Sequence, residues 1–238
     1  MGKRATVARA ASQSTVLTGH RALVVGGTAG IGHGIALRLA QAGVSVTIAG
    51  RSESRGQAVV AQMTAAAAGI DPPPTFEFIQ LNAFSLPACA TFTTSFAAKG
   101  TLDLLVLTQG MATIQGYTPT PLEDGGLDQK MTLAYWSRAL LASALAPAMK
   151  ASPDPRVLTV LSAGVHGPYK HYANDPELSR GHYSIKNAAD STGCYNDVLV
   201  DQLSAENPTI SYLHAAPGFV ATSWGTVGYQ ESIHGTSG

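Results

Sequence analysis

The sequence predicts an α/β fold, a doubly wound parallel sheet of six strands with helices on both faces. Apolar strand-like runs alternate with helix-like segments along the chain. The strand-like runs are continuously apolar, which is typical of parallel strands that helices cover on both faces. Right-handed crossovers between such strands give the order 3-2-1-4-5-6, in which ligands bind at the carboxyl ends of the strands.

The composition indicates one domain that binds a small molecule. The chain has 238 residues, 45% of them hydrophobic, which is enough to bury one full core. Only 13% are charged and the net charge is zero, which argues against a nucleic-acid partner. No apolar run reaches the roughly 18 residues of a membrane span, and Cys89 and Cys194 form no metal or redox motif. We therefore expect a cytoplasmic protein with no metal site and no membrane partner.

A glycine-rich turn joins the first strand to the first helix. It lies in Val24–His33, which reads VVGGTAGIGH, and a helical apolar pattern follows it. Gly26 lets the chain turn sharply off the strand, Gly30 lets the backbone approach a phosphate, and Gly32 lets the helix pack closely on the sheet. Amides at the helix start, with the helix dipole, favour an anion, so the turn predicts a site for a dinucleotide pyrophosphate. The predicted contacts are Gly26, Thr28, Gly30, Ile31 and Gly32.

The later elements follow from apolar runs and from helix-start and helix-stop residues. Residues 44–49 form the second predicted strand, and residues 57–68 form an alanine-rich helix that Gly69 ends. Ser85 is the predicted N-cap of the next helix, with Pro87 in its first turn. The remaining strands are expected at residues 76–81, 102–108, 156–162 and 209–215, and the remaining helices at 85–99, 127–150 and 182–204.

Two glycine-containing turns resemble those of the short-chain dehydrogenase/reductase family. The first is the Gly-x-x-x-Gly-x-Gly turn, in which Val25 stands where the family usually has threonine. The second is residues 217–222, which read PGFVAT and are similar to the family's turn after its sixth strand. The resemblance covers residues 20 to about 224 and extends to an atypical group of fungal reductase-like proteins. It implies a Rossmann-type fold and a nicotinamide cofactor.

The resemblance divides the chain into three expected segments. Residues 1–20 are an N-terminal extension, residues 21–224 are the dinucleotide-binding and catalytic domain, and residues 225–238 are a disordered tail. The family's seventh strand is not readable after residue 222, so we expect the sixth strand to be a sheet edge. A homodimer is expected at most, through the helices at 127–150 and 182–204.

The cofactor implied is NADP rather than NAD. The residue just past the second strand decides how the adenosine ribose is recognised. Ala49 and Gly50 provide no acid there, and Arg51 offers a planar cation that suits a 2′-phosphate. By resemblance, Asn82 is the polar contact to the adenine, and Gly110 is what remains of the family's Asn-Asn-Ala-Gly stretch. The further predicted contacts are Arg51, Ser52, Asn82, Gly110, Pro217, Gly218, Val220 and Thr222.

The resemblance also implies a catalytic serine and tyrosine. Ser162 closes the fifth strand and matches the family's serine, whose hydroxyl polarises the substrate oxygen. Tyr183 opens the stretch Tyr-Ser-Ile-Lys-Asn-Ala-Ala, which aligns without a gap on the family's Tyr-Ser-x-x-Lys-Ala-Ala, so it matches the proton donor. Asn187 stands in the lysine position, and Lys186 is the nearby cation, three residues from Tyr183 on one face of the expected helix. In the alternative register, Lys186 is the lysine and His182 takes the tyrosine position.

A second departure from the family lies in the helix expected at 127–150. Ala134 stands where the family has an asparagine, and alanine cannot hold the relay water attributed to that asparagine. Tyr135 and Arg138 are the polar neighbours, and we interpret both as helix surface. The loop at 166–180, rich in histidine and tyrosine, is expected to line the substrate site or to pack on itself.

These patterns together predict an NADP-dependent oxidoreductase that acts on a carbonyl or alcohol of a small apolar metabolite. The predicted catalytic residues are Ser162, Tyr183 and Lys186. One alternative is an NADP-binding protein without redox turnover, which Asn187 and Ala134 favour. Another is a non-redox isomerase or cyclase that uses the same cleft.

Overall fold

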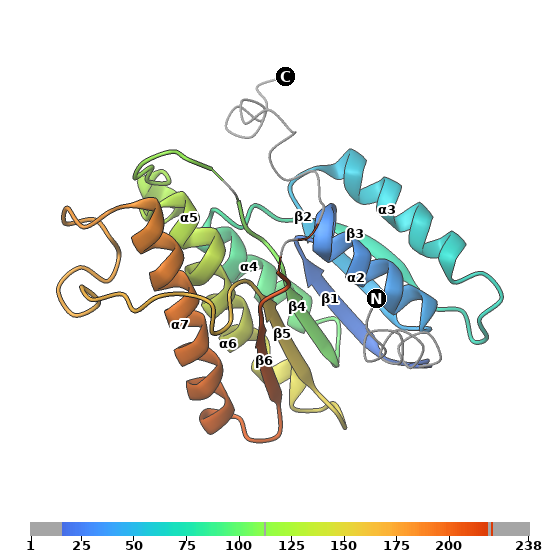
Figure 1. Cartoon of the computed structure of the whole chain (residues 1–238). Coiled ribbons are helices and arrows are strands. Elements are labelled where there is room, and N and C mark those ends of the chain that lie inside the picture. Colours follow the sequence, from blue (N-terminus) through green and yellow to red (C-terminus); the bar gives the residue numbers. More distant parts are fainter. Residues whose placement is uncertain (1–15, 112, 219, 221–238) are drawn as a thin grey trace.

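Six parallel strands form a single sheet through the centre of the structure (Figure 1). The computed structural model describes residues 16–111, 113–218 and 220. The strand order is β3-β2-β1-β4-β5-β6, which confirms the predicted topology. The strands are β1 (Arg21–Val25), β2 (Ser45–Gly50), β3 (Phe76–Gln80), β4 (Leu104–Leu107), β5 (Arg156–Val160) and β6 (Ser211–Ala215).

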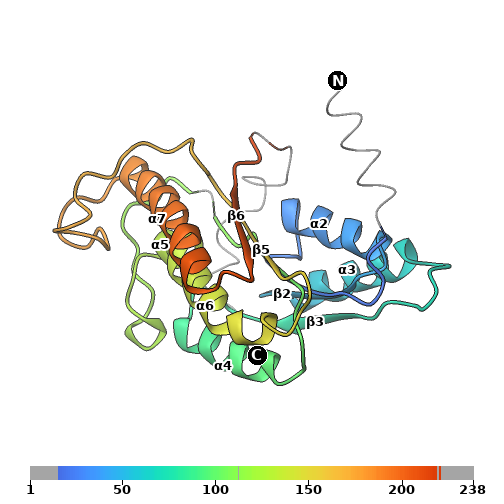
Figure 2. The same cartoon turned by 90° about the horizontal axis from the view of Figure 1, so that it is seen from below.

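Helices cover the sheet in two layers, with α2 and α3 on one face and α4, α6 and α7 on the other (Figure 2). The α-helices are α2 (Gly30–Gln41), α3 (Glu53–Ala66), α4 (Leu86–Ala97), α5 (Gln129–Met131), α6 (Ser137–Met149) and α7 (Ile185–Glu206). A short 3-10 turn at Leu122–Asp124 precedes α5, and a π-helical turn at Thr132–Trp136 joins α5 to α6.

One large apolar cluster lies on each side of the sheet, and a third, smaller cluster joins Met131, Tyr169, Leu178 and Ala188. Successive residues of β1 point to opposite faces, as the two-residue period of a strand requires. Leu23 packs in the cluster that contains Phe96 of α4, whereas Val24 packs with Ala36 of α2 and Met63 of α3. Both faces of the central strands are therefore dry, which explains why their sequences are continuously apolar.

Local capping explains where the helices begin. Ser85 accepts a hydrogen bond from the Ala88 amide and Pro87 lies in the first turn of α4, as predicted. Ser52 caps α3 at Glu53, so this helix begins four residues before its predicted start. The helix predicted from residue 182 begins only at Ile185, because Ser184 caps it by accepting the Asn187 amide.

The helix predicted at 127–150 differs from the prediction in where it begins and in the shape of its first turns. Asp128 is the N-cap and accepts the amides of Lys130 and Met131, so helical structure begins at Gln129. The π-helical turn then widens the backbone around Ala134 before α6 begins. Such single wide turns lie frequently at functional sites.

The described part of the chain ends next to an exposed sheet edge. Among the described residues, the β6 strand pairs with β5 only, and Leu213 is 50% exposed. Within the described ranges, no helix is both long and apolar enough to cross a bilayer. The same residues contain no group of three or more metal-ligating side chains. Thr222, the predicted tail, the seventh-strand segment and residues 1–15 lie outside the described residues.

Candidate active site

The glycine turn after β1 is packed tightly against the end of β4. Gly26 has a positive φ of 83°, which lets the chain leave the strand sharply. A Cβ atom on Gly32 would lie 2.4 Å from the Gly26 carbonyl oxygen and 2.4 Å from Thr108 Oγ1. Thr108 Oγ1 in turn donates to the Val25 carbonyl at 2.9 Å. Only glycine fits at position 32, because the helix approaches the strand end this closely.

The start of α2 has the features of an anion site. Its N-cap is Ala29, whose side chain caps no amide, and the first turn contains no acidic residue. Gly30, the first residue of the helix, is exposed and has a φ of 55°. The first amides of a helix and the positive end of its dipole attract a phosphate at such a position. The dinucleotide pyrophosphate predicted for this turn stays a prediction.

The predicted ribose and adenine contacts lie beside this turn. A Cβ atom on Gly50 would lie 3.0 Å from Thr28 Cγ2, so the ends of β1 and β2 are adjacent. The Arg51 guanidinium stacks over the Phe84 ring, 4.9 Å from its centroid. Asn82 Oδ1 accepts the Phe84 amide at 3.2 Å, which holds that ring under Arg51. The end of β2 therefore presents a positive charge held beside the glycine turn.

Gln109, two residues after β4, turns its polar side chain inward. Gln109 is buried, and its Nε2 donates to Ser137 Oγ at 3.3 Å. Its side chain therefore points toward α6, whereas Gly110 leaves the backbone partly exposed at the carboxyl edge of the sheet. The contact that this segment can offer a ligand is therefore a close approach of the Gly110 backbone.

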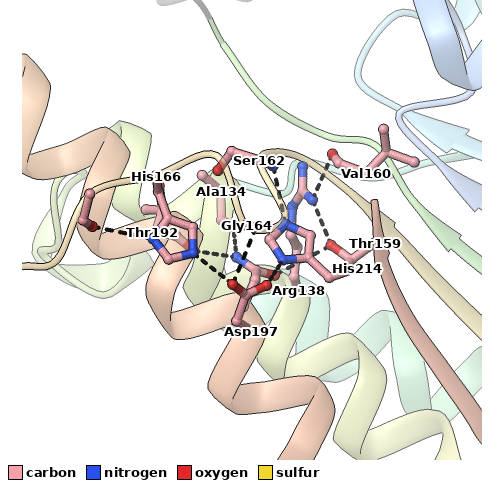
Figure 3. Close-up of polar contacts among 12 residues, drawn as sticks. Ala134, Arg138, Thr159, Val160, Ser162, Gly164, His166, Thr192, Asp197 and His214 are labelled. Atoms are coloured by element: carbon pink, nitrogen blue, oxygen red, sulfur yellow. Dashed lines mark hydrogen bonds and ion pairs between the residues drawn. The ribbon is translucent and has the colours of Figure 1, made fainter. Parts of the chain in front are cut away.

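Arg138 is a buried cation, and the prediction that it lies on the helix surface is wrong. It is 1% exposed, and its guanidinium contacts Thr159 and Val160 of β5 (Figure 3). It donates to the Gln109 carbonyl at 2.6 Å, to Thr159 Oγ1 at 2.6 Å and to the Val160 carbonyl at 3.0 Å. Burial lowers the pKa of Arg138 to about 9. The carbonyl oxygens of Val160 in β5 and of Gln109, two residues after β4, thus replace the water that a surface arginine would have.

Ser162, directly after β5, is held by a chain of two histidines and an aspartate (Figure 3). The Ser162 amide donates to His214 Nε2 at 3.1 Å. Because Nε2 accepts, the proton of a neutral His214 lies on Nδ1, which contacts Asp197 Oδ1 at 2.5 Å. Asp197 Oδ2 also contacts His166 Nε2 at 2.6 Å. The loop after β5 is therefore tied to α7 and β6.

Burial and neighbouring charges shift the pKa values of His214 and His166 in opposite directions. Burial lowers the pKa of His214, and the nearby Arg138 charge acts in the same direction. The hydrogen bond to Asp197 raises the pKa of His166. Burial acts to raise the pKa of Asp197, but its bonds with His166 and His214 hold it below its ordinary value. A neutral His214 therefore lies between a carboxylate and the Ser162 amide.

The hydroxyl of Ser162 lies against α7. Ser162 Oγ is buried and has no hydrogen-bond partner among the described residues. A Cβ atom on Gly193 would lie 2.6 Å from Ser162 Oγ, so glycine at this position makes room for the hydroxyl. An unsatisfied buried hydroxyl costs about 1–3 kcal/mol, and functional sites are where such groups occur.

Tyr183 lies before the first turn of α7 and contacts a lysine from another helix. Its hydroxyl accepts a hydrogen bond from Lys130 Nζ at 2.6 Å. The Tyr117 ring meets the Tyr183 ring edge-on, with centroids 5.6 Å apart. Gly193, beside Ser162, lies about two turns, or roughly 12 Å, farther along the helix. The backbone positions beside Ser162 and Tyr183 therefore differ by about two turns of α7.

The other residues predicted around Tyr183 have different partners. Lys186 forms an ion pair with Asp190, and its side chain is 77% exposed. The expected helix face shared by Tyr183 and Lys186 does not form, because α7 begins only after Ser184. His182 Nδ1 contacts Asp175 Oδ2 at 3.1 Å, and Asn187 Nδ2 donates to the His182 carbonyl at 2.7 Å.

An asparagine from α7 reaches the position where the family's asparagine is missing. Asn196 is fully buried and donates from Nδ2 to the Ala134 carbonyl at 2.8 Å, in the π-helical turn. The same amide donates to the Thr192 carbonyl at 2.7 Å. Tyr135 is half-buried, and its ring meets the Trp136 ring edge-on and the Tyr195 ring at a tilt, so it too is more enclosed than a helix-surface residue.

The turn after β6 is the last predicted contact that the structure describes. Pro217 and Gly218 follow the strand directly, and Gly218 has a φ of 69°. Val220 is exposed, and Thr222 lies outside the described residues. The turn therefore stands at the same carboxyl edge as the ends of β1, β4 and β5.

Six polar residues around the site were not assigned to it from the sequence. No local pattern marks them, since each acts on a residue far away in the chain. A polar residue inside an apolar helical stripe was the only signal, and it applied to Arg138 alone. The missed residues are Lys130, Arg138, His166, Asn196, Asp197 and His214.

Comparison with known proteins identifies the family. A sequence model of the family described as short chain dehydrogenase matches residues 20–174. The chain belongs to the short chain dehydrogenase family. An oxidoreductase of Emericella nidulans is 28% identical over 209 residues, which cover 85% of this chain and 59% of that protein. A polyprenol dehydrogenase of Mus musculus is 33% identical over 169 residues, 69% of this chain and 46% of that protein.

Solved structures share the fold of this family member. A metagenomic short-chain oxidoreductase in complex with NADP is 24% identical, with a TM-score of 0.67, over 86% of this chain and 83% of that chain. A short-chain dehydrogenase from Sphingobium yanoikuyae in complex with NADPH is 20% identical, with a TM-score of 0.66, over 86% and 73% of the two chains. At these identities the likeness shows the fold alone.

Proposed function

We propose that this protein is an NADP-dependent oxidoreductase that interconverts a carbonyl and an alcohol. The observation that carries the proposal is the tight glycine turn with the uncapped start of α2, which suits a pyrophosphate. The solved neighbours with NADP and NADPH, named above, support this cofactor class. Gly26, Thr28, Gly30, Ile31 and Gly32 would hold the pyrophosphate. The contacts proposed at the nicotinamide end are Gly110, Pro217, Gly218 and Val220.

We propose that Arg51 selects NADP over NAD. The residue stands at the end of β2, held over Phe84 and beside Thr28, and no acid precedes it there. A guanidinium forms charge-assisted hydrogen bonds with a 2′-phosphate, whereas an acid at this place would repel it. Ser52 and Asn82 complete this end of the site.

The chemistry divides between the cofactor and two side chains. The bound nicotinamide supplies or accepts the hydride. Ser162 Oγ, which is buried and unpartnered, would donate a hydrogen bond to the substrate oxygen and orient it. Tyr183 would donate its phenol proton to that oxygen as the alcohol forms, as a general acid.

The surface around the site suits an apolar substrate. Six large apolar side chains are exposed on the loops after β4 and β5 and at the start of α7, where a ligand of a doubly wound sheet enters. They are Ile114, Tyr117, Leu122, Val165, Tyr172 and Ile185. Removing such surface from water favours an apolar molecule over a charged one.

Cofactor titration tests the proposal. NADPH and NADH are added separately to the protein while the fluorescence of the reduced nicotinamide is measured. We expect tighter binding of NADPH, and Arg51→Ala should remove most of that preference while leaving NADH binding unchanged. Equal affinity for both cofactors in the wild type would refute the assignment of Arg51.

A second candidate function is NADP binding without turnover. The observation that favours it is the distance along α7 between Gly193, beside Ser162, and Tyr183, before the helix. A saturable NADPH signal with no oxidation of NADPH in the presence of a broad set of aldehydes and ketones would support this candidate. We also propose that any self-association is a homodimer through α6 and α7, which light scattering would test.

A further inference from the structure

Lys130 connects Tyr183 with the loop that follows β4. It lies in α5, next to the N-cap Asp128, and is 53 residues from Tyr183 in the chain. Its Nζ donates to Tyr183 Oη at 2.6 Å, to the Gln115 carbonyl at 2.7 Å and to the Gly116 carbonyl at 3.3 Å. An ammonium has three donors, so these contacts engage all of them.

The backbone under Lys130 is held firmly. Asp128 is fully buried and accepts the amides of Thr118, Lys130 and Met131. This carboxylate therefore fixes the start of α5 against the loop that follows β4. A lysine held both by its backbone and by two carbonyl oxygens presents its charge to Tyr183 at a defined place.

We propose that Lys130 is the cation that assists Tyr183 in proton transfer, in place of a lysine on the tyrosine's own helix. This inference rests on the proposed function of Tyr183. Because an ammonium only donates, the phenol oxygen is the acceptor in this contact and the phenol keeps its own proton to give. When the substrate oxygen takes that proton, one O–H bond breaks, another forms, and the phenolate left behind lies next to the ammonium.

The surrounding charges are consistent with this role. The Tyr117 ring is the aromatic group packed against Tyr183. Asp128, Glu177 and Asp175 are the acids whose charges reach this neighbourhood, and they act together with burial to raise the pKa of Tyr117. Burial lowers the pKa of Lys130, and Asp128 opposes that effect. Lys130 thus places a positive charge on a phenol in an otherwise acidic neighbourhood.

Lys186 cannot supply that charge in the described arrangement. Its Nζ pairs with Asp190, one turn farther along α7. The bond with Lys186 also lowers the pKa of Asp190, which shows that the lysine charge is used there. Lys186 is therefore the lysine close to Tyr183 in the sequence, whereas Lys130 is the lysine that contacts it in space.

The direct test measures ionisation of Tyr183 without any substrate or cofactor. The protein is labelled with tyrosine carrying carbon-13 at the ζ position, and Tyr183→Phe assigns the Tyr183 signal among the eight tyrosines. We expect the pH titration of this signal to move upward in Lys130→Gln, which retains a hydrogen-bond donor but not the charge. Lys130→Arg should keep most of the wild-type behaviour. Lys150→Met, at the far end of α6, should leave the titration unchanged.

Turnover provides the second measurement and separates the two proposals. If carbonyl reduction is observed, Lys130→Gln should lower kcat about tenfold or more at neutral pH, with less loss as the pH rises, while the NADPH dissociation constant stays the same. An unchanged titration in Lys130→Gln, or a larger shift in Lys186→Met, would overturn the role of Lys130. Full activity of Tyr183→Phe would instead refute the proposed function of Tyr183 and leave the titration result standing.

Discussion

The two halves of the site are built in different ways. In the β1-α2-β2 half, the backbone makes the site: a glycine turn, free helix amides and one arginine close to them in the chain. In the half around β5, α7 and β6, side chains distant in sequence make it. Ser162 and His214 are 52 residues apart, and Lys130 and Tyr183 are 53 apart. The backbone half is written in one continuous stretch of sequence, whereas the partners of Ser162 and Tyr183 are scattered along the chain.

The largest expected effect is in the second half. Tyr183→Phe removes only the hydroxyl that donates the proton, so turnover should fall about 100-fold or more. NADPH affinity should stay within about twofold, because the cofactor contacts belong to the other half. Steady-state kinetics together with fluorescence titration measure both. A collapse of turnover in His182→Ala but not in Tyr183→Phe would establish the other register.

The next effect is on stability. Arg138→Met removes a buried charge but leaves the carbonyls of Gln109 and Val160 without their donor. We expect the free energy of unfolding to fall by about 3 kcal/mol, because each unsatisfied buried acceptor costs about 1–3 kcal/mol. Urea denaturation measures the loss. Arg55→Met, an exposed arginine of α3, is the matched control and should change stability by less than about 0.5 kcal/mol.

Two glycines of α2 separate the backbone contribution from general helix propensity. Gly32→Ala places a Cβ atom 2.4 Å from the Gly26 carbonyl and should destabilise the protein by about 1–3 kcal/mol and weaken NADPH binding. Gly34→Ala meets nothing within 4 Å and should stabilise the helix by about 0.5–1 kcal/mol. Thermal melts with and without NADPH compare the pair. Equal behaviour of the two variants would mean that the turn does not need the close approach.

The smallest expected effect is the pH dependence of the His214 contact. Burial lowers the pKa of His214, so the folded protein favours the neutral ring. The unfolded chain binds the proton more readily, and this contribution is therefore present above the ordinary histidine pKa and lost as pH falls through it. His214→Asn should lose about 1 kcal/mol at pH 7.5 and less at pH 5.5. Denaturation at the two pH values checks this, and an equal loss at both would contradict it.

His166 has the opposite sign and serves as an internal comparison. Its pKa is raised by the bond with Asp197, so its contribution is present below the ordinary value and lost as pH rises. A variant at His166 should therefore cost more stability in acid than near neutrality. The two histidines share one carboxylate but respond to pH in opposite directions.

The sequence predicted the sheet order and the glycine turn because both follow from local rules. Continuous apolar runs identify buried strands. Gly26 is needed for a positive φ and Gly32 for a close approach of the helix to the strand end. Ser85 was predicted as a cap for the same local reason. Helix starts were missed where another cap lay nearby, as Ser52 and Ser184 show.

Ser162 and Tyr183 were named by resemblance, but their partners could not be predicted, because those contacts depend on distance in space. A charged residue on a helix is usually exposed, so Arg138 was placed at the surface, although carbonyls of two strands satisfy it inside. The π-helical turn changes which residues face the sheet, and it has no clear sequence signal. Lys186 was chosen for Tyr183 by sequence spacing, which the Ser184 cap makes irrelevant.

The enclosure of Arg138 also makes it a chemical reporter. Arginine-selective dicarbonyl reagents modify guanidinium groups that water can reach, and this one is sealed by the strand ends that it joins. Its modification requires β4 and β5 to separate from α6, so the labelling rate at this residue would count such opening events. Peptide mass spectrometry of the labelled protein would therefore measure how often β4 and β5 separate from α6, and whether bound NADPH reduces that opening.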